Sequence, residues 1–171
     1  MTKATEVHNG MELIDSRDVI KRIEELTEFK NAALEAATEA TARIVELEGQ
    51  AELDENDEDE LDTLRDSLWV SVDNFEYGEC VDWTETEAEE LKQLEALADD
   101  AGGCADWKYG EGLIRDSYFQ EYAEQLAEDT GAIGRDAKWP CDHIDWEAAA
   151  EALQQDYTSV EYDGVTYWIR S

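Results

Sequence analysis

Acidic residues are concentrated in the middle of this chain, where they oppose folding into a compact shape. Residues 46–100 hold 22 Asp and Glu but only two bases, Arg65 and Lys92, which gives this stretch a net charge of −20. The full 171 residues have a net charge of −33, from 46 acids and 13 bases. Repulsion of this size excludes nucleic acid or an anionic membrane as a direct ligand, and it favours association with a basic surface.

Two explanations of the charge require no partner. One is an acidic disordered tail, but 42% of the residues are apolar, and six Trp, seven Tyr and three Phe are enough to form a core. The other is a uniformly acidic surface, as in proteins adapted to high salt. That explanation predicts acids spread along the chain, whereas 20 of the 33 net charges lie within 55 residues. The concentration therefore favours a specific role for the charge.

The density of these acids is close to that of phosphates in DNA. In residues 46–100, 22 acids in 55 residues are one acid per 2.5 residues. On a helix that rises about 1.5 Å per residue, this is roughly 3.8 Å per carboxylate, against about 3.4 Å per phosphate along one DNA strand. The charge of the whole chain, −33, equals that of about 16 base pairs. The sequence therefore predicts a protein that imitates a polyanion.

The first half of the chain has the pattern of two antiparallel helices. Good N-capping residues at Asp15 and Ser16, followed later by Gly49, predict one long helix between them. Its apolar residues recur at spacings of three and four and form one stripe: Val19, Ile20, Ile23, Leu26, Ala33, Leu34, Ala37, Ile44 and Leu47. The acidic run 54–62 leads into a second helix that folds back on the first, with an inner side formed by Leu61, Leu64, Leu68 and Trp69.

The second half has the pattern of shorter helices and a hairpin. Residues 73–84 interrupt the helical periodicity and predict a connector, after which Thr84 and Glu87 have the spacing of a capping box. Ser117 and Asp145 are expected to open two further helices. In the last segment, residues 159–170, strand-forming residues flank Asp163-Gly164, a dipeptide typical of a two-residue type I′ hairpin turn.

These patterns predict an α+β fold that is predominantly helical. Residues 1–78 are expected to form a helical hairpin region with an acidic turn, and residues 79–171 a small α+β region that ends in a β-hairpin. No stretch approaches the roughly 20 apolar residues of a membrane span, and residues 1–10 lack the apolar core of a signal peptide. We therefore expect a cytoplasmic protein, in the cytoplasm of a host cell, that binds no membrane.

The C-terminal region resembles a known family. The similar pieces are residues 113–131 (LIRDSYFQEYAEQLAEDTG), Trp139-Pro140, residues 144–149 (IDWEAA) and residues 156–168, which include DYTSV and DGVTYW. In order and spacing these pieces resemble the C-terminal region of the ArdA-type antirestriction proteins and related phage-encoded proteins. The N-terminal helical hairpin departs from that family, whose typical members open with small α+β modules.

The resemblance implies the same class of function that the charge predicts, namely imitation of a polyanion. Members of the family are acidic, elongated, often dimeric proteins that imitate bent B-form DNA and occupy the DNA-binding groove of type I restriction-modification enzymes. We therefore expect a DNA-mimic inhibitor that occupies the DNA-binding cleft of a host defence nuclease complex. The sequence leaves three kinds of target open: a restriction enzyme, a CRISPR surveillance complex or another DNA-binding defence protein. The alternative is an acidic chaperone or scaffold for a basic nucleic-acid-binding partner.

The acids on the expected helices are the candidate binding residues. Charges at the rim of an interface act together and contribute little singly, so we expect a surface rather than one essential residue. The predicted phosphate-like set is Glu52, Asp54, Glu55, Asp57, Glu58, Asp59, Glu60, Asp62, Glu85, Glu87, Glu89 and Glu90. We also expect a homodimer formed through the C-terminal hairpin, because the acidic middle region would repel its own copy.

The sequence contains no motif for catalysis and predicts no cofactor. It has no Gly-rich phosphate loop, no serine elbow and no HExxH motif, so we expect that the protein is not an enzyme. Cys80, Cys104 and Cys141 could supply a zinc site together with His143, but they form no Cys-x₂₋₄-Cys pair. We expect reduced, packed thiols and no bound metal.

Overall fold

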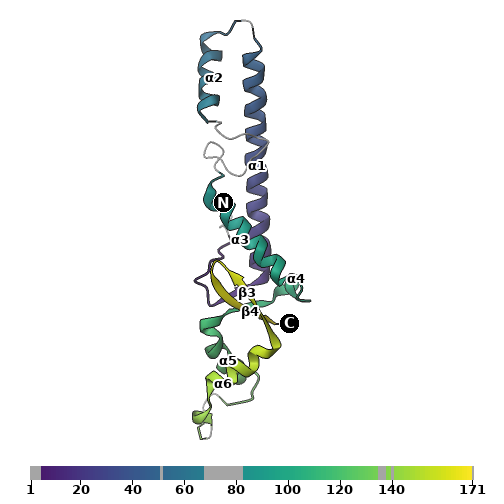
Figure 1. The fold of residues 1–171 in the computed structure, drawn as a ribbon, viewed down its shortest axis with the longest axis vertical. Coiled ribbons are helices and arrows are strands. Elements are labelled where there is room, and N and C mark those ends of the chain that lie inside the picture. Colours follow the sequence, from purple (N-terminus) through teal and green to yellow (C-terminus); the bar gives the residue numbers. More distant parts are fainter. Residues whose placement is uncertain (1–4, 51, 68–82, 135–137, 140, 171) are drawn as a thin grey trace. The chain divides into compact units, whose positions relative to one another are not determined.

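The computed structural model describes residues 5–50, 52–67, 83–134, 138–139 and 141–170, and it has the predicted α+β class (Figure 1). The chain forms two compact units. Residues 23–92 form one, which we call the arm unit; residues 1–22 together with 93–171 form the other, the sheet unit. The boundary predicted between residues 78 and 79 lies outside the described residues.

Two helices of the arm unit form the predicted acidic hairpin. Helix α1 (Ser16–Glu48) begins in the sheet unit and continues through the arm, and α2 (Glu55–Ser67) follows it after a short turn. The predicted apolar stripe of α1 is confirmed within the arm, where Leu26, Ala33, Ala37 and Leu47 are buried. On α2, Leu61 is buried and Leu64 is half-buried, whereas the predicted core residues Leu68 and Trp69 lie outside the described residues.

The predicted capping box opens the third helix, α3 (Glu85–Ala101). A carboxylate oxygen of Glu87 accepts hydrogen bonds from the backbone amide of Thr84, at 3.2 Å, and from its hydroxyl. Just before the helix, the indole of Trp83 is fully buried and meets the ring of Phe29 edge-on, with centroids 5.7 Å apart. The inner residues predicted for this helix, Leu91, Leu94 and Leu97, are buried as expected.

The sheet unit is built on four antiparallel strands in the order β1-β2-β4-β3. Their bounds are Leu13–Asp15, Gly112–Arg115, Tyr157–Tyr162 and Val165–Arg170 for β1, β2, β3 and β4. The predicted hairpin is β3–β4, in which Tyr162 pairs with Val165. Positive φ angles at Asp163 (46°) and Gly164 (72°) give the expected type I′ turn.

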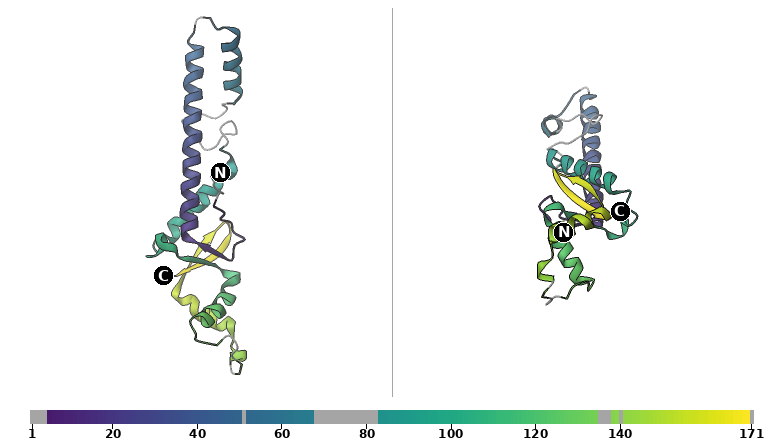
Figure 2. Two further views of the ribbon diagram at one scale, coloured as in Figure 1. Left: turned by 180° about the vertical axis from the view of Figure 1, so that it is seen from behind. Right: turned by 60° about the horizontal axis from the view of Figure 1, so that its bottom comes forward.

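The hairpin uses its two faces differently. Val160, Tyr162, Tyr167 and Ile169 share one face and are buried. The other face carries Trp168, which packs with Ile114 of β2 against a cluster of helical residues that includes Phe119, Ala123 and Ala150. These belong to α5 (Phe119–Asp129) and α6 (Trp146–Leu153), which lie together on this side of the strands (Figure 2).

The start of α5 differs from its prediction. Ser117 was expected to cap the helix, but residues Asp116–Tyr118 form a 3₁₀ turn, and α5 starts at Phe119 without a side-chain cap. The turn is fixed by the indole Nε1 of Trp168, which donates to a carboxylate oxygen of Asp116 at 2.8 Å. The predicted cap at Ser117 is therefore wrong, and a tertiary hydrogen bond holds the first residue of the turn instead. The cap predicted at Asp145 is confirmed, since its carboxylate accepts from the amide of Ala148 at 3.1 Å.

Short elements complete the sheet unit. Helix α4 (Trp107–Gly110) precedes β2, and further 3₁₀ turns span Cys141–His143 and Gln154–Asp156. The start of α1 is tied to α4 through Ser16, a fully buried residue whose hydroxyl donates to the carbonyl of Trp107 at 2.6 Å. Across the residues that the structure describes, no helix is long and apolar enough to span a bilayer.

Candidate partner-binding surface

The N-terminus of α2 is fixed by the first acid of the acidic run. One carboxylate oxygen of Asp54 accepts from the backbone amides of Asn56 and Asp57, each at 2.9 Å. This is the geometry of an N-cap, and the acids in the first turn also suit the positive end of the helix dipole. The most acidic stretch of the chain therefore starts a well-defined helix rather than a solvated loop.

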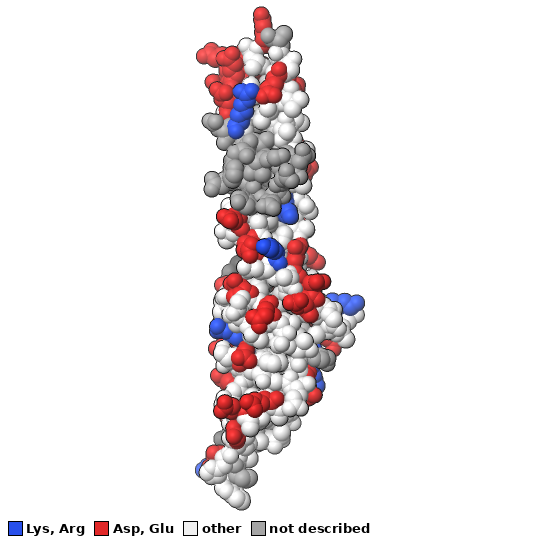
Figure 3. Space-filling view, viewed as in Figure 1, with Lys and Arg blue, Asp and Glu red and all other residues white. Residues whose placement is uncertain are grey.

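Four acids line the outer side of this helix. Glu55, Glu58, Asp59 and Asp62 are all exposed and follow one another at i, i+3, i+4 and i+7, so they share one face. Leu61 is buried on the opposite side. We call these four residues the acid ridge. Among the described residues, none of the four makes an ion pair. Figure 3 shows acidic side chains gathered over α2.

The inner acids of α2 are neutralised by an arginine of α1. The guanidinium of Arg43 donates from Nε and Nη2 to the two carboxylate oxygens of Glu60, both at 2.9 Å. It also donates to Glu46 at 2.9 Å, and its Nη2 lies 3.8 Å from Oδ1 of Asp57. These hydrogen bonds hold the pKa of the Glu60 carboxyl below its usual value and raise the pKa of the Arg43 guanidinium.

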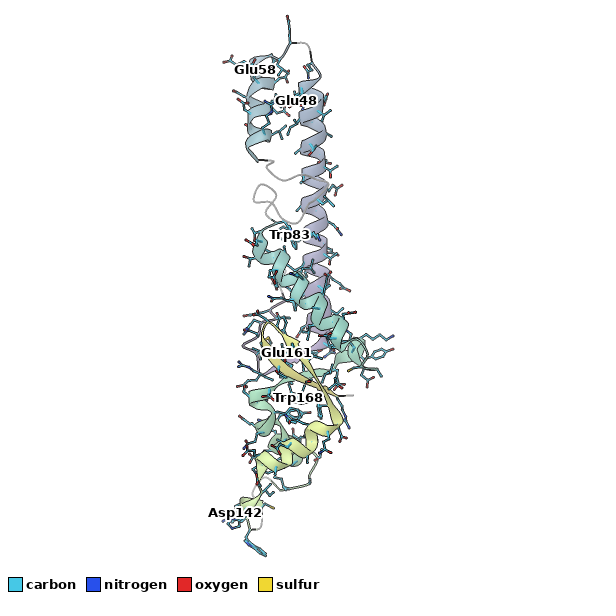
Figure 4. The ribbon with its side chains drawn as sticks, viewed as in Figure 1. Glu48, Glu58, Trp83, Asp142, Glu161 and Trp168 are labelled. Carbon is cyan, nitrogen blue, oxygen red and sulfur yellow. The ribbon has the colours of Figure 1, made fainter. Side chains whose placement is uncertain are left out.

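A second arginine, this one on α2, bridges the same two helices. Nη2 of Arg65, on α2, donates to a carboxylate oxygen of Glu48, on α1, at 2.7 Å. Each helix thus contributes one arginine that binds a glutamate of the other helix. Figure 4 marks Glu48 on α1 and Glu58 on α2. Both bridges were missed from the sequence, although an isolated arginine within an acidic run is a signal that could have indicated them.

The structure divides the acids predicted in residues 52–62 into two groups. The ridge acids and Glu52, which precedes α2, are exposed and make no ion pair with another described residue. Asp54 is used as the helix cap, and Asp57 and Glu60 face Arg43. Those last three side chains stabilise and orient the helix, so they are less suited to stand in for phosphates than the ridge acids are.

The acids predicted on α3 also fall into an exposed pair and a half-buried pair. Glu85 and Glu89 are exposed, and Lys92 lies one turn beyond Glu89 with its Nζ 3.6 Å from that carboxylate. Glu87 is half-buried and engaged in the capping box, and Glu90 is half-buried. Glu87 lies four residues before the buried Leu91, and Glu90 four residues before the buried Leu94. Both acids therefore lie on the inner side of the helix.

The arm unit as a whole carries most of the charge. Its 70 residues hold 24 acids and four bases, a net charge of −20, and the sheet unit carries the remaining −13. All twelve acids predicted as partner-binding residues belong to the arm unit. The structure therefore brings the predicted residues into one compact unit, and within it the four acids of the ridge form an exposed set on one face of α2.

Metal binding finds no support in the described part of the chain. No group of three or more His, Cys, Asp or Glu side chains there could hold an ion. Cys104 and Cys141 are free thiols, and Cys80 lies outside the described residues. Burial raises the pKa of the Cys104 thiol, which disfavours the reactive thiolate.

One pocket of the sheet unit also contains acids. It has a volume of about 320 Å³ and is lined by Glu124, Glu128, Ile133, Gly134, Cys141, Asp142, Ile144 and Trp146. His143 is exposed and is not one of its lining residues. The pocket therefore brings no histidine base to Cys141.

No protein-family model, no curated protein and no solved structure matches this chain. The resemblance of residues 113–168 to the ArdA-type proteins therefore stays a prediction.

Proposed function

We propose that this protein is a DNA-mimic inhibitor that occupies the DNA-binding cleft of a host defence nuclease complex, such as a restriction enzyme or a CRISPR surveillance complex. The proposal is that exposed carboxylates of the arm unit take the positions of DNA phosphates. In this role the protein acts stoichiometrically and needs neither a catalytic centre nor a cofactor.

The acid ridge is the observation that carries the proposal. Its four carboxylates span seven residues, or about 10.5 Å of helix, which is an average advance of about 3.5 Å between successive acids. One strand of DNA advances about 3.4 Å per phosphate. The residues of the ridge belong to a capped helix, so this spacing is defined by the fold and is not an average over a flexible chain.

The ridge also has an energetic cost that a purely structural helix would avoid. Its members form four like-charge pairs at i,i+3 or i,i+4, namely 55–58, 55–59, 58–62 and 59–62. Each such pair destabilises a helix by about 0.2–0.5 kcal/mol, so together they cost about 1–2 kcal/mol. The helix dipole offsets part of this cost at Glu55 and Glu58, which lie in the first turn, but not at Asp59 and Asp62. Glutamine and asparagine would preserve the shape without the repulsion. The carboxylates therefore suggest a requirement for charge at this face.

Displacement of DNA from a defence complex tests the proposal. A labelled duplex is bound to a type I restriction enzyme, and separately to a CRISPR surveillance complex, and its release is followed by fluorescence anisotropy as the protein is added. We expect complete release from a susceptible complex near one equivalent of protein per DNA site. Binding without any release of DNA would contradict mimicry and would favour the scaffold alternative.

A matched pair of variants tests the ridge itself. The ridge variant E55Q/E58Q/D59N/D62N and the control E95Q/E124Q/E147Q/E151Q each remove four exposed acids and have the same net charge, −29. If each ridge acid contributes about 0.5 kcal/mol, the ridge variant loses about 30-fold in affinity. The control, whose acids lie in the sheet unit, should lose much less. Equal losses would show that only the total charge matters.

A further inference from the structure

The two arginines of the arm unit, Arg43 and Arg65, both connect α1 to α2. Arg43 of α1 forms a two-pronged interaction with Glu60 of α2, with both nitrogen–oxygen distances at 2.9 Å. Arg65 of α2 binds Glu48 of α1 at 2.7 Å. The remaining bases of the arm unit are Lys30 and Lys92, and Lys92 pairs within its own helix with Glu89.

A positive charge beside the acid ridge weakens the field that would attract a basic partner. Residues 35–67 contain 13 acids and only two bases, Arg43 and Arg65. Two neutral residues at these positions would make the segment more negative. Yet both guanidinium groups bind a carboxylate of the other helix, Arg43 through two nitrogens in a forked geometry and Arg65 through one. This use points to a role in fixing how the two helices lie against each other.

We infer that Arg43 and Arg65 are positioning residues, which set how α2 lies along α1 and so hold the acid ridge in the arrangement that the partner recognises. This inference rests on the proposed function. Among the described residues of α2, Leu61 is buried and Leu64 is half-buried, and apolar contacts of this kind have little directionality. The two bridges supply directional contacts in addition.

The inference makes a prediction opposite in sign to that of simple electrostatics. Replacing both arginines by glutamine makes the net charge −35, so a diffuse polyanion would bind a basic partner more tightly. If the bridges position the ridge, binding weakens in spite of the added negative charge, because the partner then has to order α2 as it binds.

The experiment compares R43Q/R65Q with K30Q/K92Q, which has the same net charge of −35 but keeps both bridges. Affinity is measured over a salt series with the defence complex that releases its duplex to the unmodified protein. We expect R43Q/R65Q to bind about tenfold more weakly. The slope of the logarithm of the binding constant against the logarithm of salt concentration should become shallower by about one unit or more, since fewer charges engage the partner at once. K30Q/K92Q should bind as tightly as the unmodified protein or more tightly.

A charge exchange separates positioning from a simple requirement for arginine. The double variant R43E/E60R keeps the net charge at −33 and restores a bridge of reversed polarity. It should recover part of the affinity that R43Q loses; the recovery is incomplete because the carboxylate introduced by R43E also faces Glu46 and Asp57. No recovery, with a helix content by circular dichroism equal to that of the unmodified protein, would overturn the positioning role of Arg43.

Amide hydrogen exchange gives a readout that needs no partner. Exchange of the α2 amides should be faster in R43Q/R65Q than in K30Q/K92Q and the unmodified protein. If R43Q/R65Q matches its control in both exchange and affinity, the inference is wrong while the proposed function stands. If no complex releases DNA to the unmodified protein, the proposed function fails, and the exchange result alone still decides whether the bridges hold α2.

Discussion

The side-chain amide of Asn9 donates to a carboxylate oxygen of Asp163, 154 residues further along the chain, at 2.9 Å. This contact joins the segment before β1 to the turn of the β3–β4 hairpin. Tyrosine hydroxyls of the same hairpin extend the attachment: that of Tyr162 donates to the carbonyl of Val7, and that of Tyr167 to the carbonyl of Met11. The N-terminal segment is thus fixed to the sheet by polar contacts.

Removing the hydroxyl of Tyr167 should loosen this segment. Tyr167 is fully buried, and its hydroxyl lies 2.9 Å from the carbonyl of Met11 and 3.0 Å from that of Asn9. We expect Tyr167→Phe to lower the free energy of unfolding by about 1–2 kcal/mol, measured by urea denaturation. The same change at Tyr109, which is 68% exposed, is the control and should have no measurable effect.

The Arg43–Glu60 bridge should be visible in a pH titration. Because the pKa of Glu60 is lowered by Arg43, the bridge contributes stability above the ordinary pKa of a glutamate, about 4.3, and loses it as pH falls through the lowered value. Following the carboxyl carbon of Glu60 by NMR, we expect its midpoint to move upward in R43Q. An unchanged midpoint would mean that the bridge is absent in solution.

Salt should stabilise this protein against heat. Raising NaCl from 0.01 to 0.1 M shortens the Debye length from about 30 to 10 Å, which screens the repulsion among 46 acids more than it weakens the few ion pairs. We expect the melting temperature to rise along the series. The ridge variant E55Q/E58Q/D59N/D62N carries four fewer negative charges, so its melting temperature should rise less with added salt than that of the unmodified protein. A melting temperature that falls with salt would contradict the repulsion argument.

Self-association through the hairpin is tested by light scattering. The structure places β3 at one edge of the sheet. Along an antiparallel pair the backbone amides point alternately toward the partner strand and away from it. Counted from the Tyr162–Val165 pair, the amide of Ser159 points away from β4. A second copy could pair with this edge, so we expect a dimer of the 19.4 kDa chain that strengthens with salt. Ser159→Pro should abolish it and preserve the fold, because the lost amide serves no bond to β4. A monomer at every salt and protein concentration would refute the dimer.

Local patterns in the sequence predicted most of the helices and the hairpin, because their signals lie within a few residues. The cap at Asp145 and the turn at Asp163-Gly164 are examples, and both are confirmed. Strands β1 and β2 were not predicted. They have three and four residues, too few to show a period, and Leu13 pairs with Ile114 about 100 positions away. Such strands are defined by tertiary pairing and not by local preference.

The candidate surface, too, was predictable where it depends on local sequence and not where it depends on tertiary contacts. Its location in residues 52–62 followed from the acid count, and the outward side of α2 followed from the apolar spacing around Leu61. Which acids are neutralised could not be predicted, because it depends on how α2 is rotated and shifted against α1. Arg43 and Glu60 are 17 residues apart, and the turn between the helices determines whether they meet.

The order of the strands has a consequence for synthesis on the ribosome. Strand β1 is made early, but its partner β2 follows about 100 residues later, and β4, which pairs with β2, ends at residue 170. At about 5–20 residues per second, β1 waits roughly 5–20 s for β2. All of residues 23–92 are made within that interval, so the nascent chain has the complete acidic arm before any strand of the sheet can pair.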